Sequence, residues 1–143
     1  PEAGAAIKDP HAMSPLPGHA PEQPIEIIFD GGSRGNPGFG YGSYALRWPG
    51  LVQQNVQLKI GQRVTNNEAD YDTLIASLEA TLKRLRDVVA DPQTARLIVR
   101  GDSLLELKQD KGEWKCKEPR HRPRMTHVRQ LLANFKVANL ILH

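Results

Sequence analysis

The chain has almost no cysteine and no long hydrophobic run. Cys116 is the only cysteine among its 143 residues, so no disulfide can form within the chain, and a reducing compartment fits best. No set of His and Cys residues has the spacing of a zinc site. No apolar stretch is long enough to span a bilayer. We therefore expect a cytoplasmic protein that makes no contact with membranes.

The first 24 residues lack any periodicity and are rich in Pro, Ala and Gly. They have neither the basic start nor the continuous apolar segment of a signal peptide. We expect residues 1–24 to be a flexible tail or a linker from a longer protein, without chemistry of its own. Residues 25–143 are long enough to form one domain with its own core.

The formal net charge of +3 is unevenly distributed. Residues 111–143 contain eight Lys and Arg residues against two Glu residues, whereas the rest of the chain has a small excess of acidic residues. A basic segment beside acidic residues is typical of a protein that holds a polyanion within reach of metal-binding carboxylates. A basic loop that is merely solvated would explain the same distribution.

Alternating apolar residues and turn signals predict an α/β domain with the element order βββαβααβ. Thr65, Asn66 and Asn67 supply a helix start, and apolar residues from Tyr71 to Val89 recur at three- and four-residue spacings. A helix that joins two strands usually returns the chain in parallel, so we expect a mixed five-stranded sheet with helices packed on it. The predicted strands are 25–30, 41–48, 51–60, 96–100 and 137–142; a Gly-rich turn spans 31–40, and the later helices are 103–111 and 125–135.

Asp30 and Asp102 each follow a short apolar run, at the predicted ends of two buried strands. An Asp before glycine either caps a turn or holds a hard cation. If the two strands are parallel neighbours, both carboxylates meet at one edge of the sheet, where α/β proteins tend to bind ligands. Like charges at such an edge are costly unless a cation offsets them, and oxygen ligands suit Mg²⁺.

Three motifs in this order resemble the type 1 ribonuclease H family. They are Asp-Gly-x-x-x-x-Asn-Pro-Gly at 30–38, Thr-Asn-Asn-x-x-acid at 65–70 and Gly-Asp-Ser at 101–103. The resemblance covers residues 25–143 and implies a ribonuclease H-like fold. It also implies a metal-dependent endoribonuclease that hydrolyses the RNA strand of RNA/DNA hybrids, leaving 5′-phosphate and 3′-hydroxyl ends. Two Mg²⁺ ions would be the cofactors, with Mn²⁺ as a substitute.

The resemblance implies that Asp30, Asp70 and Asp102 are catalytic and bind the metal. Asp30 would bridge the two ions, and Asp102 would bind the ion that positions the attacking water. Asp70 stands where the family usually has Glu, and its side chain is one methylene shorter. Glu68 is the rival helix acid, but positions two apart on a helix differ by about 200°, so both cannot face one metal. The family register selects Asp70.

The resemblance also implies a set of contacts to the hybrid. The three Asn residues would contact its minor groove, Thr65 would hold a DNA phosphate, and Trp114 would pack on the DNA strand. Several of these residues have ordinary structural roles as well, because Asn before Pro suits a turn and Asn66 suits a helix cap. We expect no obligate protein partner and a monomer. The predicted substrate-binding residues are Ser33, Asn36, Thr65, Asn66, Asn67 and Trp114.

The chain departs from the family in two further ways. The family has a fourth acid at the start of a helix after the last strand, whereas this chain has no Asp or Glu after Glu118. We therefore expect the domain to lack its C-terminal helix. The family's long basic protrusion is also shortened, and basic residues at 120–124 would replace part of it. Asp70 and the missing fourth acid keep open a weakened hybrid-binding module or a substrate-trapping variant. A ribonuclease H domain excised from a reverse transcriptase also stays open, with the Pro/Ala-rich tail as its linker.

Overall fold

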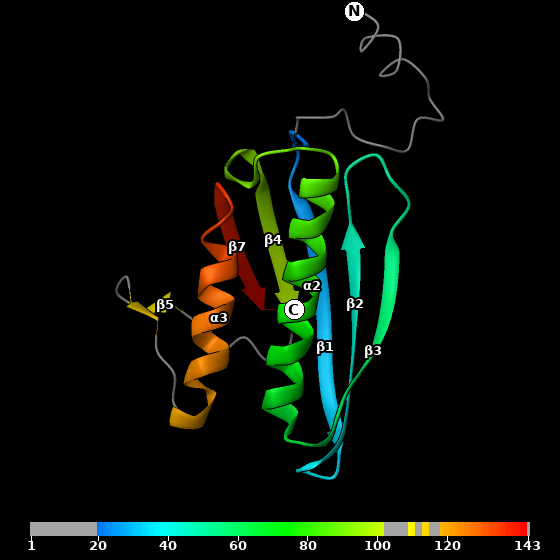
Figure 1. Cartoon of the computed structure of the whole chain (residues 1–143), viewed down its shortest axis with the longest axis vertical. Helices are drawn as coiled ribbons and strands as arrows, with labels where there is room; N and C mark the ends of the chain where they lie inside the picture. Colours follow the sequence, from blue (N-terminus) through cyan, green and yellow to red (C-terminus); the bar gives the residue numbers. More distant parts are fainter. Residues whose placement is uncertain (1–19, 102–108, 111–112, 115–117, 143) are drawn as a thin grey trace, which may run out of the picture.

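The computed structural model describes residues 20–101, 109–110, 113–114 and 118–142. Its strands and helices follow one another in the order shown in Figure 1. The elements are β1 (Ile25–Arg34), β2 (Gly38–Arg47), β3 (Gln54–Val64), α2 (Asn66–Asp87), a 3-10 turn (Pro92–Thr94), β4 (Arg96–Gly101), β5 (Gln109–Asp110), β6 (Glu113–Trp114), a second 3-10 turn (Pro119–His121), α3 (Arg122–Leu132) and β7 (Val137–Leu142).

Five strands form one mixed sheet in the order β3-β2-β1-β4-β7. β1 is antiparallel to β2, which is antiparallel to β3, whereas β4 is parallel to both β1 and β7. α2 lies across β1, with α3 beside it on the same side of the sheet (Figure 1). The predicted mixed five-stranded sheet with helices packed on it is confirmed.

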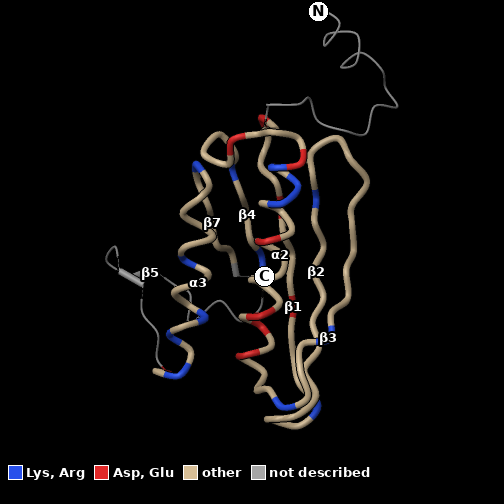
Figure 2. Tube along the Cα trace, in the orientation of Figure 1, with Lys and Arg blue, Asp and Glu red and all other residues tan. Residues whose placement is uncertain are grey.

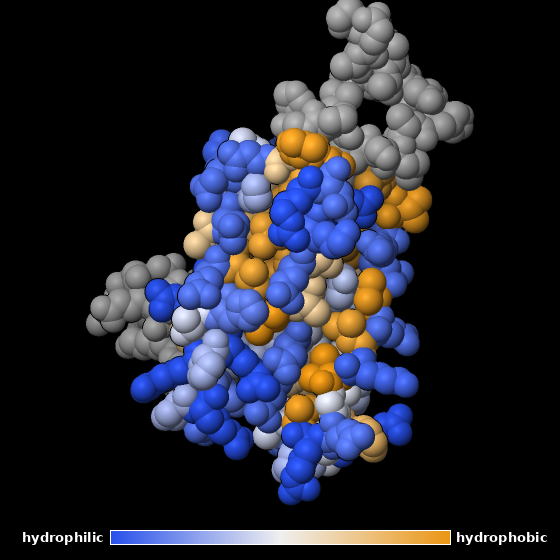
Figure 3. Space-filling model, viewed as in Figure 1, coloured by the Kyte–Doolittle hydropathy of each residue, from blue (hydrophilic) through white to orange (hydrophobic). Residues whose placement is uncertain are grey.

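α2 begins where the sequence predicts, because Thr65 is its N-cap. The apolar residues Leu74, Leu78 and Leu85 are fully buried against the sheet, as their helical spacing requires. Figure 3 shows hydrophilic residues on the outward side of α2 and α3 and hydrophobic residues between them. The predicted stripe is wrong only at its end: the helix stops at Asp87, and Val89 is 76% exposed.

The Gly-rich segment after Asp30 is strand rather than turn. β1 continues to Arg34 and β2 begins at Gly38, so the predicted turn over 31–40 shrinks to three residues. Glycine is compatible with pairing here because Gly31 lies opposite Gly42 in the β1–β2 ladder. Asp30 therefore lies within a paired strand and not at its end.

Two predictions about the second half of the chain need correction. The helix predicted over 103–111 is wrong at its end, since Gln109–Asp110 is β5 and pairs with β6; residues 103–108 lie outside the described part. α3 begins at Arg122 rather than 125 and ends at Leu132.

The start of the described chain lies against the folded domain. Ala20 packs against the hydrophobic core, within the segment predicted to be a tail; residues 1–19 lie outside the described part. The division into a tail of 1–24 and a domain of 25–143 stays a prediction. Among the described helices, none has the length and apolar composition needed to cross a membrane.

Candidate active site

Asp30 lies where the parallel pairing of β1 and β4 ends. Phe29 and Gly101 form the last pair of that ladder, and the two strands pack so closely that a Cβ on Gly101 would lie 2.5 Å from the Phe29 ring. Asp30 is exposed and pairs with Ser43 of β2. Asp102 follows Gly101 in sequence but lies outside the described residues, so its role stays a prediction.

Asp70 reaches β1 from the first turns of α2. Its Oδ1 accepts a hydrogen bond from the Gly31 amide at 2.8 Å, and the residue is only 8% exposed. The helix comes so close that a Cβ on Gly31 would lie 2.6 Å from the Ala69 carbonyl oxygen. Glycine at 31 is therefore required for this approach, which brings a helix carboxylate to the residue next to Asp30.

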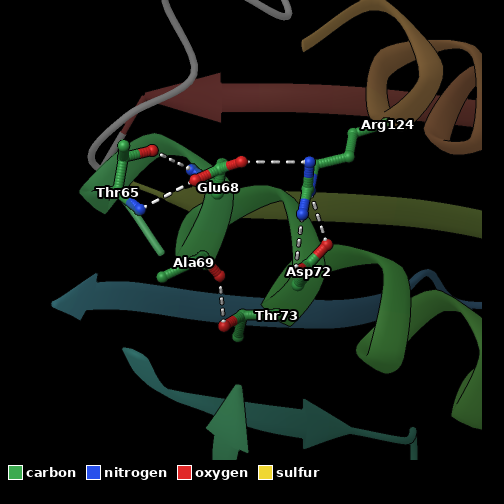
Figure 4. Close-up of polar contacts among 6 residues, drawn as sticks. All are labelled: Thr65, Glu68, Ala69, Asp72, Thr73 and Arg124. Carbon is green, nitrogen blue, oxygen red and sulfur yellow. Dashed lines mark hydrogen bonds and ion pairs between the residues drawn. The ribbon is translucent and has the colours of Figure 1, made fainter. Parts of the chain in front are cut away.

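Glu68, the rival acid, is held on another side of α2. Its Oε1 accepts from the Thr65 amide at 2.9 Å while the Thr65 hydroxyl accepts from the Glu68 amide, which is a capping box. Its Oε2 lies 3.3 Å from Arg124, which also pairs with Asp72 at 2.9 Å (Figure 4). The hydrogen bond from the Thr65 amide, together with the nearby arginines, lowers the pKa of Glu68. Glu68 therefore fixes the helix start and its contact with α3.

The predicted Asn and Ser residues gather at the turn between β1 and β2. Asn66 Oδ1 accepts from the Ser33 amide at 2.8 Å and from the Ser33 hydroxyl at 3.1 Å. The backbone N–H of Asn66 in turn donates to Asn36 Oδ1 at 3.0 Å, and the Ser33 hydroxyl also donates to the Gly35 carbonyl. These bonds tie the β1–β2 turn to the start of α2, so the structural role of Asn66 and Asn36 is present whatever else they bind.

A groove of about 520 Å³ opens beside this cluster. Four predicted substrate-binding residues line it, and Ser33 is not among the described lining residues. Trp114 belongs to β6, but its side chain is not described, so its role stays a prediction. The lining residues are Asn36, Pro37, Arg63, Thr65, Asn66, Asn67, Glu68, Glu118, Arg120 and His121.

Arg63 of this groove was missing from the sequence-based candidates, and Arg120 was expected only among the basic residues that replace the protrusion. Arg63 stands two residues before Thr65, so a cation close to the predicted phosphate contact was a usable signal in the sequence. Arg120 becomes part of the groove because the 3-10 turn before α3 lies beside the start of α2, where His121 contacts Tyr71. That contact is tertiary, so no local sequence pattern predicts it.

The basic residues at 120–124 do not act as one patch. His121 is only 2% exposed, and its ring lies 5.5 Å from that of Tyr71. Arg124 is engaged by Asp72 and Glu68 of α2, where Figure 2 shows acidic residues facing the basic start of α3. The expectation that these residues replace a basic protrusion is wrong for His121 and Arg124, because burial and ion pairing commit both to the fold.

The chemistry of the donor set fits a hard divalent cation. Asp30 and Asp70 supply carboxylate oxygens, which Mg²⁺ prefers as protein ligands, and they come from neighbouring points of β1 and α2. Within the described residues, no three acidic, His or Cys side chains lie close enough together to hold a metal. The third predicted ligand, Asp102, is outside that set.

Comparison with known proteins adds relatives that are similar along most of the chain. The chain is 38% identical over 117 residues to ribonuclease HI of Halobacterium salinarum, a match that covers 78% of this chain and 52% of the relative. It is 37% identical over 119 residues to the bifunctional protein Rv2228c of Mycobacterium tuberculosis, covering 80% of this chain and 30% of the relative. No family model matches the sequence. The chain thus spans about half, or less, of the length of these curated relatives.

Solved structures agree with the sequence matches. The crystal structure of RNase H1 from Halobacterium salinarum superposes with a TM-score of 0.62 at 32% identity, over 85% of this chain and 86% of that one. LC11-RNase H1 in complex with an RNA/DNA hybrid superposes with a TM-score of 0.64 at 27% identity, over 83% and 84%. The likeness therefore extends over nearly the whole of each compared structure.

Proposed function

Because this chain belongs to the type 1 ribonuclease H family, we propose that it hydrolyses the RNA strand of RNA/DNA hybrids with the help of divalent metal ions. The products would carry 5′-phosphate and 3′-hydroxyl ends. One of the similar structures, LC11-RNase H1, is a complex with an RNA/DNA hybrid, which supports the same substrate here. Two Mg²⁺ ions, replaceable by Mn²⁺, are the proposed cofactors.

The single observation that carries the proposal is the hydrogen bond from the Gly31 amide to Asp70 Oδ1, at 2.8 Å. It brings a helix carboxylate to β1 at the residue next to Asp30, which supports a metal site shared by the two elements. A carboxylate has about four lone-pair positions, so an oxygen that accepts from an amide retains acceptor capacity. Asp30, Asp70 and Asp102 are the proposed ligands. Bound ions would supply a nucleophilic water and offset charge on the phosphodiester.

The remaining residues would bind and orient the substrate. Asn36, Asn66 and Asn67 line the groove with amide groups that donate and accept hydrogen bonds, which suits the 2′-hydroxyls and base edges of a minor groove. Ser33 would approach the same groove through its position beside Asn66. Thr65 would contact a DNA phosphate, with Arg63 as a nearby cation. Trp114 is proposed to pack on the DNA strand.

The test is cleavage of a labelled RNA/DNA hybrid by the parent chain and by Asp30→Asn, with Mg²⁺ or Mn²⁺. We expect cleavage of the hybrid but not of duplex DNA, and a loss of at least about 100-fold in the variant, since a metal ligand supplies several kcal/mol of transition-state stabilisation. Asp91→Asn is the matched control, because Asp91 caps the 3-10 turn before β4 at a different place in the fold. An Asp30→Asn variant as fast as the parent would contradict the mechanism.

A weakened hybrid-binding module is the second candidate, favoured by the short side chain of Asp70. It is distinguished by measuring binding and cleavage of the same hybrid in parallel. Tight binding without product under either ion would support the binding module and contradict the enzyme. The single cysteine supports a reducing, cytoplasmic environment, which we also propose. We further propose that the chain is a monomer, which sedimentation velocity tests.

A further inference from the structure

We propose that the open face of the sheet next to Asp30 binds single-stranded nucleic acid that continues from the hybrid. The surface consists of Arg34, Phe39, Tyr41 and Lys59, and we call it the aromatic face. It adds a second binding surface to the proposed active site and therefore rests on the proposed function. Its occupant is an unpaired strand, recognised by stacking on exposed rings and by cations that follow its phosphates.

The strand register places these residues on one side of the sheet. Asp30 pairs with Ser43, and two positions further along β1, Gly32 pairs with Tyr41. Tyr41 is also paired with Lys59 of β3. Because residues two apart on a strand share a face, Asp30 and Tyr41 lie on the same side.

The far end of the surface follows the same rule. Arg34 pairs with Phe39, which stands two positions from Tyr41 on β2. This is the side opposite α2, since Gly31 and Gly42 are the positions that meet the helix. The aromatic face therefore begins directly beside Asp30 and leads away from it.

Both rings of the aromatic face are exposed. Phe39 is 63% exposed and Tyr41 is 51% exposed, whereas Tyr44 and Phe29, on the side that faces α2, are buried. Gly32 makes room for Tyr41, because a Cβ at position 32 would lie 2.8 Å from the Tyr41 hydroxyl. Exposed aromatic residues that lie together usually mark a binding surface. Here they lie about 6.8 Å apart along one strand, so each can offer a separate ring.

The chemistry of the face favours an unpaired nucleic acid strand over a duplex. Paired bases already stack on one another, so free ring faces gain most from unpaired bases, and sheets with exposed aromatics use this mode of binding. Arg34 and Lys59 are exposed and cationic, which complements the phosphate charge. Since Asp30 is at the border of the face, a strand leaving the proposed cleavage site reaches it without a separate domain.

The experiment compares the affinity for a blunt RNA/DNA hybrid with that for the same hybrid carrying a single-stranded extension. Binding is measured by anisotropy in EDTA, so that no strand is cut. We expect the parent to bind the extended hybrid at least about fivefold more tightly, since stacking contributes about 1–3 kcal/mol per base. The double variant Phe39→Ala/Tyr41→Ala should bring the ratio of the two affinities close to one. Val52→Ala, at another exposed apolar residue, should keep the parent's ratio.

Two further measurements keep the proposal testable if the double variant folds poorly. Phe39→Trp adds a fluorescent ring on the face to Trp48 and Trp114 of the parent, and we expect the extended hybrid, but not the blunt one, to quench the emission that the variant has in excess of the parent. Lys59→Gln should lower the salt dependence of the extra affinity by about 0.7 in the logarithmic slope, as expected for one phosphate contact on a single strand.

Equal affinity of the parent for blunt and extended hybrids would overturn the proposal, and so would an unchanged ratio in the folded double variant. A dimer of the parent that Phe39→Ala/Tyr41→Ala dissociates would also overturn it, because a second copy would then occupy the face. Cleavage of the blunt hybrid is measured separately with Mg²⁺ and reports on the proposed activity alone. Failure of the aromatic face and failure of the enzyme are therefore distinguishable.

Discussion

The two halves of α2 are held in the fold by different kinds of contact. Near the N-terminus, polar side chains bond to other elements: Asn66 to the β1–β2 turn, Asp70 to β1, and Glu68 to α3. Towards the C-terminus, the contacts are apolar, and the buried hydroxyls of Ser77 and Thr81 bond to carbonyls of their own helix. One half is positioned by directed bonds and the other by burial.

Within α2, the N-terminal half therefore determines the geometry of the proposed site, and the C-terminal half contributes mainly to the stability of the fold. Burial is proportional to area and tolerates small shifts, whereas a hydrogen bond to a given atom depends on distance and angle. Loss of a buried apolar side chain in the C-terminal half should therefore act on the free energy of unfolding, and substitution of Asp70 in the N-terminal half should act on the proposed site. The predictions below test this separation, in order of decreasing expected effect.

Leu78→Ala should have the largest effect, and on stability alone. Leu78 is fully buried, and Leu→Ala in a core costs about 2–5 kcal/mol through lost burial and the remaining cavity. Urea denaturation followed by circular dichroism measures this loss. The exposed Val52→Ala should change the free energy of unfolding by less than about 0.5 kcal/mol. A small loss for Leu78→Ala would show that the C-terminal half is not held by burial.

Asp70→Asn should slow cleavage while leaving the fold in place. Asn keeps an oxygen that can accept from the Gly31 amide but removes the negative charge that a metal requires. We expect a rate loss of at least about 100-fold, equivalent to about 2.7 kcal/mol in the barrier. Asp87→Asn, in an exposed ion pair at the other end of α2, is the matched control. If Asp70→Asn instead lowers the free energy of unfolding while the folded variant cleaves at the parent's rate, the assignment of roles along α2 is wrong.

Val89→Gly should stabilise the protein. Val89 has φ of 57°, a left-handed conformation that is unfavourable for a β-branched residue, and it follows the helix at the position where Gly is usual. The Ala90 and Val89 amides close the helix on the Leu85 and Arg86 carbonyls, so Gly would keep both bonds. We expect a gain of about 1 kcal/mol, seen as a higher urea midpoint. An unchanged urea midpoint would mean that contacts of the Val89 side chain stabilise the fold by as much as its left-handed backbone conformation destabilises it.

Glu68→Gln should have the smallest effect, and one that depends on pH. The hydrogen bond from the Thr65 amide and the nearby arginines lower the pKa of Glu68 in the folded state below that of an ordinary glutamate. A carboxyl with a lowered pKa stabilises the fold above the unfolded pKa and loses this contribution as pH falls through the folded pKa. The parent should therefore be more stable than the variant above about pH 4.5, with the difference shrinking on acidification. A pH-independent difference would contradict the ionic role of Glu68.

The sequence predicted those parts of the fold that local chemistry determines. Thr65 marks the start of α2 because capping is settled within one turn, and the strands that alternate in apolar character lie in the expected sheet. The end of α2 was missed because no glycine marks it; Val89 takes the left-handed position instead. The turn after Asp30 was placed too early, since glycines at 31 and 32 continue the β1 ladder.

The candidate site was predictable in part only. Asp30, Asp70 and the Asn residues carry motif spacing, and the structure brings Asp70 rather than Glu68 to β1. Their metal-binding roles stay predictions, as does the role of Asp102. Arg120 and Arg124 could not be placed from sequence, because the packing of α3 beside α2 decides whether each faces the groove or an acidic partner.

The capping box at Thr65 has a consequence for how the site assembles. Its bonds lie within four consecutive residues, so local contacts alone set the start of α2 and with it the rotational phase of the helix. Glu68 takes part in the capping box, and Asp70, two positions later, therefore lies on a different side of the helix. The four residues of the capping box therefore determine which carboxylate of α2 faces the sheet.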